Sequence, residues 1–263
     1  MLHHRIHTHP DPHASWVVFL HGAGGSSTIW YKQIRAFKES HHVLLIDLRG
    51  HGLSKIPWNP NELKRYSFDL LAKDVVEVLD AVKVQQAHFV GISLGCILIR
   101  QLAEQYPGRV ASMILGGAIL KMNIRSRLLM WLGNISKNVL PYMLLYRFFA
   151  WIILPRKNHK ESRILFIREA KKVQQKEFLR WYKLTANLTG VLKLFRSKDL
   201  GIPTLYLMGE DDHLFLAAVQ DTVARHPSAQ LVVFAQCGHV VNVQQPDRFN
   251  QESLAFLQSL RSA

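Results

Sequence analysis

One short stretch limits what this chain can fold into more than any other: residues 87–95, with the sequence AHFVGISLG. An apolar run ends at a glycine, and the GISLG segment at 91–95 leads directly into a helical pattern. This G-x-S-x-G spacing predicts a buried strand, a sharp turn with Ser93 at its tip, and a helix. Glycines two residues to either side avoid the collisions that side chains would make where the helix packs closely on the strand.

The rest of the chain alternates between strand and helix patterns. Apolar runs of strand length occur at 16–20, 43–46, 110–115, 204–208 and 231–234. Helical periods follow at 28–37, 68–82, 94–106, 216–225 and 248–260. This order predicts an α/β fold, in which helices flank a mostly parallel central sheet. Sites in such folds lie at the carboxyl ends of the strands, where His21, Asp47 and Ser93 are expected.

Residues 121–198 interrupt this alternation with a segment that is helical in period, basic and strongly apolar. We expect a helical cap, or lid, inserted into an α/β core made of residues 1–120 and 199–263. Apolar residues of the cap, such as Trp131, Phe148 and Trp151, are candidates for a substrate pocket beneath it. The other interpretation of this segment is a helix that lies on a membrane surface.

Lysine and arginine exceed aspartate and glutamate by 14 (33 against 19), mostly through residues 121–198. A positive charge of this size favours binding to nucleic acid, to anionic membranes or to acidic small molecules. Because the sequence has no zinc-finger spacing and no RNA-binding signature, we do not expect nucleic-acid binding. Peripheral contact of the basic cap with an anionic membrane stays open, as does the oligomeric state.

The chain has two cysteines, Cys96 and Cys237, which make no disulfide framework and fit a reducing compartment. The first residues are polar and lack the apolar core of a signal peptide, so we expect a cytoplasmic protein. Five histidines occur by residue 13, at positions 3, 4, 7, 9 and 13. We expect a polar edge strand and turn here rather than a metal site, because no ligand spacing is evident.

A serine nucleophile needs a base within hydrogen-bond reach and a third group that orients the base. The sequence offers Ser93, then acidic residues at 210–212, then His239 beside a glycine. Each follows a predicted strand, and serine–acid–histidine is the chain order of the α/β-hydrolase triad.

Five segments occur in the order typical of one superfamily: HGAGGSS (21–27), DLRGHGLS (47–54), GISLG (91–95), GEDD (209–212) and GHVVNVQQP (238–246). The chain resembles the α/β-hydrolase fold superfamily over nearly its whole length. The resemblance implies Ser93 as nucleophile, His239 as base and Asp212 as acid, with Asp211 as the alternative. It also implies backbone N–H donors to an oxyanion at Ala23 and Leu94, and bracing roles for Asp47, Arg49 and His51.

The resemblance implies a serine hydrolase that cleaves an ester or thioester through an acyl-enzyme. The leucine, methionine, tryptophan and phenylalanine residues of 121–198 suggest a substrate with an apolar acyl or alcohol group, and the excess of arginine and lysine there suggests an anionic portion or a membrane-bound substrate. No metal and no organic cofactor is implied. Serine at position 93 disfavours the branches of the superfamily that use an aspartate there, and Gln244 and Leu216 depart from the residues common in relatives. Two other interpretations remain: hydrolysis of a carbon–carbon bond in a diketone-like compound, and a non-enzymatic receptor for a small ligand.

Overall fold

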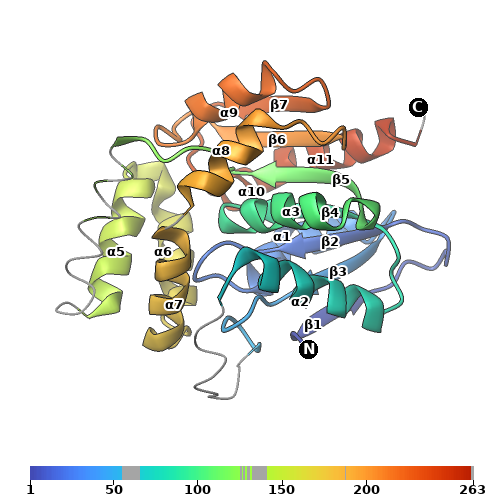
Figure 1. Cartoon of the computed structure of the whole chain (residues 1–263), viewed down its shortest axis with the longest axis horizontal. Coiled ribbons are helices and arrows are strands. Elements are labelled where there is room, and N and C mark those ends of the chain that lie inside the picture. Colours follow the sequence, from blue (N-terminus) through green and yellow to red (C-terminus); the bar gives the residue numbers. More distant parts are fainter. Residues whose placement is uncertain are drawn as a thin grey trace.

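The structure is a computed structural model of the whole chain, and it describes residues 1–54, 66–124, 126, 128, 131, 141–186 and 188–261. Its strands are β1 (His4–His7), β2 (Trp16–Leu20), β3 (His42–Ile46), β4 (Ala87–Ile92), β5 (Val110–Gly116), β6 (Thr204–Gly209) and β7 (Ala229–Phe234). They form one sheet in the order β1-β3-β2-β4-β5-β6-β7 (Figure 1). Only β1, at the edge, pairs antiparallel in this sheet; the other neighbours run parallel. The predicted α/β class and the predicted polar edge strand are both confirmed.

Helices cover both faces of the sheet because the buried strands are apolar on both sides (Figure 1). In β2, Val18 joins the core beneath α2 and α3, whereas Phe19 joins the core beneath α1 and α11. The bounds are η1 (Ser27–Trp30), α1 (Tyr31–Phe37), α2 (Phe68–Ala81), α3 (Leu94–Gln105), η3 (Pro107–Arg109), α9 (Leu216–Val223), α10 (Val241–Gln244) and α11 (Pro246–Ser259). The helix predicted at 28–37 is therefore a 3₁₀ turn followed by α1.

Between β5 and β6 the chain forms α5 (Tyr142–Ile153), η4 (Lys157–His159), α6 (Lys160–Ala170), α7 (Gln175–Ala186) and α8 (Thr189–Ser197). We call α5 to α8 the inserted helices. The strands on either side of them are direct neighbours, with Met113 in register with Thr204. In Figure 1, α5, α6 and α7 stand together at one end of the sheet.

The inserted helices occupy part of the range 121–198 in which a cap is predicted. Positions 125, 127, 129, 130, 132–140 and 187 of that range lie outside the described residues. Across the described part of the chain, no helix has both the length and the apolarity that a membrane crossing needs.

Candidate active site

Ser93 occupies the turn between the end of β4 and the first residue of α3. Its backbone has φ 55° and ψ −114°, in a region that residues with a side chain rarely adopt. The flanking glycines allow α3 to approach the sheet. A Cβ on Gly95 would lie 2.3 Å from the carbonyl oxygen of Leu20, and one on Gly91 would lie 2.6 Å from a methyl of Ile99. The strand, turn and helix predicted from the G-x-S-x-G spacing are present.

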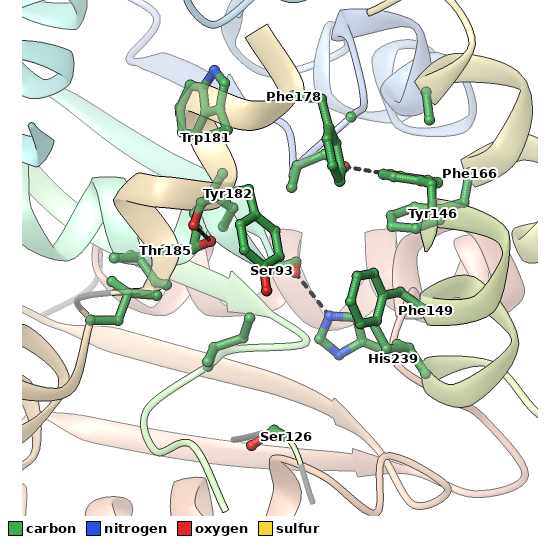
Figure 2. A pocket seen from close by; sticks show the side chains of 18 of the residues that line it. Ser93, Ser126, Tyr146, Phe149, Phe166, Phe178, Trp181, Tyr182, Thr185 and His239 are labelled. Carbon is green, nitrogen blue, oxygen red and sulfur yellow. Dashed lines mark hydrogen bonds between the residues drawn. The ribbon is translucent and has the colours of Figure 1, made fainter. Parts of the chain in front are cut away.

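Ser93 is connected to two buried residues by a chain of hydrogen bonds. The Ser93 hydroxyl lies 2.9 Å from Nε2 of His239, and Nδ1 of His239 lies 2.7 Å from Oδ2 of Asp212. Asp212 follows β6 and His239 follows β7. With the proton on Nδ1, the imidazole donates to the carboxylate and accepts from the serine, as Figure 2 shows for the serine. The three residues are therefore arranged for transfer of the serine proton to His239.

Asp211, the alternative acid in the sequence, is directed elsewhere. Its Oδ1 lies 2.6 Å from Arg156, and its Oδ2 lies 3.5 Å from Nε2 of His159. Both partners belong to η4 and its N-cap, directly before α6. Of the two aspartates, Asp212 is the one that the fold brings to His239.

Two backbone N–H groups border the cavity beside Ser93, at Ala23 and Leu94. Leu94 begins α3, so its N–H has no acceptor within the helix. Neither N–H has an acceptor among the described residues. Both are therefore free to donate to an oxyanion that forms on a substrate carbonyl.

The loop that holds Ala23 is braced from two sides. Gly24 donates its N–H to Nε2 of His51 at 3.0 Å, and Nδ1 of His51 donates to the carbonyl of Arg49 at 3.1 Å. Burial, with a contribution from His21, lowers the pKa of His51 to about 3, so the ring stays neutral and acts as an acceptor. On the other side, the Tyr146 hydroxyl donates to the carbonyl of Ala23 at 2.9 Å. No sequence pattern distinguishes Tyr146 from the other aromatic residues of α5.

Asp47 and Arg49 also brace the loops, as the resemblance implies. Asp47 accepts the backbone N–H groups of Ser27 at 2.7 Å and Leu53 at 2.9 Å. Burial would raise the pKa of Asp47, but these hydrogen bonds outweigh it and lower the pKa. Arg49 forms a bidentate ion pair with Asp74 on α2, with N–O distances of 2.5 and 2.6 Å. Neither side chain lines the cavity.

Ser93 and His239 open on a cavity of about 200 Å³ between the sheet and the inserted helices (Figure 2). Its wall is almost wholly apolar and includes Tyr146, Phe149, Ile153, Phe166, Phe178, Trp181, Tyr182, Ile97, Leu214 and Phe215. The cap residues singled out from the sequence take other positions. Trp131, Phe148 and Trp151 are 57%, 49% and 61% exposed and lie outside the cavity wall. The expectation for these three is thereby corrected: their side chains point to solvent, and other aromatic residues line the pocket.

The remaining reactive side chains are separate from this cavity. Cys96 and Cys237 are buried, and burial raises the pKa of Cys237 to about 12, so its thiol stays protonated. Within the described ranges, no cluster of three or more histidine, cysteine, aspartate or glutamate residues could hold a metal ion.

Comparison with known proteins finds a matching family model and several similar enzymes. The family model described as alpha/beta hydrolase fold matches residues 15–143. A protein named as a carbamate hydrolase in Variovorax paradoxus (strain S110) is 37% identical over 126 residues, which cover 48% of this chain and 45% of that protein. A protein of Bacillus subtilis (strain 168), named as a 2-succinyl-6-hydroxy-2,4-cyclohexadiene-1-carboxylate synthase, is 27% identical over 93% of this chain and 90% of its own length.

Among solved structures, the enol-lactonase from Burkholderia xenovorans LB400 superimposes with a TM-score of 0.80. The match covers 98% of this chain and 96% of that one at 20% identity. At this identity the likeness concerns the fold, and it extends over the sheet and the inserted helices alike.

Proposed function

Because this chain belongs to the α/β-hydrolase fold superfamily, we propose that it is a serine hydrolase that cleaves an ester or thioester with a neutral, apolar acyl group. The observation that carries the proposal is the hydrogen-bonded series Ser93, His239 and Asp212, which opens on an apolar cavity. The relatives support a hydrolase in general, since they include a protein named as a carbamate hydrolase and an enol-lactonase. The substrate class rests on the cavity.

In the proposed reaction, His239 accepts the proton of Ser93 while the serine oxygen attacks the substrate carbonyl. Asp212 holds the imidazole in the required tautomer and stabilises the imidazolium. The N–H groups of Ala23 and Leu94 donate to the tetrahedral oxyanion, and each contributes roughly 3 kcal/mol by analogy with measured oxyanion donors. His239 then protonates the leaving alcohol or thiol. In the second half, His239 takes a proton from a water molecule as the water oxygen attacks the acyl carbon. The bond from that carbon to the Ser93 oxygen then breaks, His239 returns the proton to this oxygen, and the acid is released.

We also propose that the inserted helices act as a cap over this site. Among the described residues, several hydrogen bonds tie them to loops of the core in addition to the bond from Tyr146 to Ala23. Trp181 donates to the carbonyl of Arg49 at 3.0 Å, Ser26 donates to Glu169 at 2.9 Å, and Tyr66 donates to Glu177 at 2.6 Å. A cap held in this way keeps water away from an acyl-enzyme and strengthens the electrostatic interactions in the site.

The cavity wall favours a neutral substrate. No lysine or arginine is among its described lining residues, so a carboxylate there would be buried without a partner, which is strongly unfavourable. The Bacillus relative, in contrast, is named for a carboxylate. We therefore propose a small molecule with an apolar acyl group and no charge near the reacting carbonyl. A cytoplasmic location remains a prediction from the sequence.

Hydrolysis of p-nitrophenyl esters of increasing acyl length tests the proposal, with Ser93→Ala and Ser126→Ala compared with the wild type. Ser126 is a matched control because it also lines the cavity, but its hydroxyl donates to the carbonyl of Asn123 at 2.9 Å. We expect turnover with a clear optimum in acyl length, lost in Ser93→Ala and retained in Ser126→Ala. Esters that carry a terminal carboxylate on the same acyl chains should be poorer substrates.

A fluorophosphonate probe separates the remaining interpretations. Labelling at Ser93 without ester turnover would favour carbon–carbon bond hydrolysis or a ligand receptor, and would refute the substrate class proposed here. Absence of labelling in the folded wild type would refute Ser93 as a nucleophile.

A further inference from the structure

Helix α5 is apolar on two opposite faces. Its inner face contributes Tyr146, Phe149 and Ile153 to the cavity wall. Its outer face carries Leu144, Phe148 and Trp151, which are 51%, 49% and 61% exposed. The spacing of three, four and seven residues places each set on one side of the helix. A helix that is apolar all round is normally covered all round, by protein or by lipid.

The outer face of α5 has no cover in the described structure. The helix stands at the periphery of the molecule in Figure 1, and among the described helices it packs mainly against α6. Arg147 is the only charged residue of α5, and it is exposed between Leu144 and Phe148. Exposed apolar side chains gathered on one helix face, two of them aromatic here, are typical of a contact surface.

The charge of the chain is concentrated in the same segment. Residues 121–198 hold 18 of the 33 lysines and arginines but only 3 of the 19 aspartates and glutamates. This segment therefore carries +15 (18 − 3), whereas the rest of the chain carries −1 (15 − 16). Many of these cations are exposed on the described helices or next to their ends, among them Arg147, Lys157, Lys160, Lys171 and Lys183. A segment with this charge is attracted to acidic lipids.

We propose that the outer face of α5 docks on an anionic lipid bilayer, with Phe148 and Trp151 inserted at the interface. The helix has 12 residues, about 18 Å in length, which is too short to cross a hydrocarbon core of about 30 Å. It is suited to lie in the interface, where Trp is favoured and Arg147 can extend to the lipid phosphates. A second copy of the chain fits less well, because two segments of +15 repel each other.

The docking extends beyond the proposed hydrolysis and does not depend on it. Since the inner face of α5 lines the cavity, docking of the outer face brings the cavity close to the bilayer surface. An apolar ester dissolved in the membrane would then reach Ser93 without crossing much water. Membrane binding and ester hydrolysis are measured in separate assays. A protein that fails to bind vesicles can therefore still be tested for hydrolysis, and an inactive protein can still be tested for vesicle binding.

Sedimentation with vesicles tests the docking. Phosphatidylcholine vesicles are compared with vesicles that also contain phosphatidylglycerol, at salt concentrations of about 50 and 500 mM. We expect binding to the anionic vesicles that weakens at high salt. The double variant Phe148→Gln/Trp151→Gln should bind at least about tenfold more weakly than the wild type, because the inserted apolar surface is lost. Ile6→Gln/Tyr31→Gln, which changes two exposed apolar residues of the core, should bind as the wild type does.

Insertion itself is read from tryptophan quenching by brominated lipids. Wild-type protein should be quenched in anionic vesicles, and Trp151→Phe should lose most of the quenching while it retains binding. Ser93→Ala should bind and be quenched as the wild type is.

Four results would overturn the proposal. They are absence of binding to anionic vesicles, equal binding of the α5 and control variants, quenching that persists without Trp151, and a dimer in light scattering that the α5 variant dissociates. The last would identify a second copy as the occupant of this face. Unchanged thermal unfolding of the exposed-site variants shows that they are folded.

Discussion

Tyr146 of α5 donates its hydroxyl hydrogen to the carbonyl oxygen of Ala23, at 2.9 Å. A Cβ on the next residue, Gly24, would lie 2.3 Å from the same hydroxyl, and Gly24 has φ +71°. The absence of a side chain at Gly24 therefore admits the tyrosine. Burial raises the pKa of Tyr146 well above its usual value, so the hydroxyl stays a donor at all ordinary pH values. Through this bond an inserted helix fixes the loop that carries the Ala23 N–H.

We expect Tyr146→Phe to lower kcat for a good ester by about tenfold, because the Ala23 peptide loses its anchor. KM should change less, since the ring and its packing on Phe166 remain. The free energy of unfolding should fall by about 1 kcal/mol because the buried carbonyl of Ala23 loses its donor. Steady-state kinetics and urea unfolding measure the two effects.

Tyr31→Phe is the control for Tyr146→Phe, because it removes a hydroxyl from a tyrosine that is 53% exposed and is not part of the cavity wall. It should leave both quantities unchanged. A Tyr146→Phe protein with wild-type kcat would show that α5 does not position the oxyanion donor.

The neighbouring aspartates 211 and 212 should give opposite results. Asp212→Asn should lower kcat by about 10³–10⁴-fold with little effect on folding, because the amide favours the wrong tautomer of His239. Asp211→Asn should keep most of the activity but lose stability, because Asp211 pairs with Arg156 at 2.6 Å and faces buried His159. Ester kinetics and thermal unfolding of both variants provide the comparison. Equal losses of activity would contradict the separation of roles.

Much of this arrangement follows from local sequence. Continuous apolar runs identify the parallel strands, because a strand buried on both faces needs apolar side chains on both. The polar residues that follow those runs meet at the carboxyl ends of the parallel strands. This is why Ser93, Asp212 and His239 come together from positions as far apart as 93 and 239.

The cavity wall could not be predicted in the same way. Helical periodicity locates a buried face only when the opposite face is polar, and α5 is apolar on both. Phe148 and Phe149 are adjacent in sequence, yet the first is 49% exposed and the second lines the cavity. The phase of the helix is set by tertiary contacts, such as the bond from Tyr146 to Ala23.

The glycine after Ser93 provides a steric test of the fold. In Gly95→Ala the new Cβ would lie 2.3 Å from the carbonyl oxygen of Leu20 and 2.9 Å from that of His21. Both neighbours are backbone atoms that a rotamer change cannot move, so we expect a loss of about 3 kcal/mol or more in the free energy of unfolding. Gly108→Ala is the matched control, since no atom lies within 4 Å of its added Cβ. Similar stabilities of the two variants would contradict the close packing of α3.

The stability of the protein should fall as the pH is lowered from 7 toward 4, partly through His51. Burial lowers the pKa of this histidine to about 3, whereas in the unfolded chain it titrates near 6.5. Between these values the unfolded state binds the proton and the folded state does not, so acidification favours unfolding. From pH 7 to pH 5 the expected loss from His51 alone is about 2 kcal/mol.

His51→Gln separates this contribution from those of other groups, because glutamine still offers an acceptor to the Gly24 N–H but does not titrate. The variant should therefore lose about 2 kcal/mol less than the wild type between pH 7 and pH 5, as measured by urea unfolding at each pH. His13→Gln, on an exposed residue, should follow the wild-type curve. Parallel curves for His51→Gln and the wild type would mean that His51 is protonated in the folded state over this pH range. That result would contradict the assignment of a neutral His51 ring as the acceptor of the Gly24 N–H.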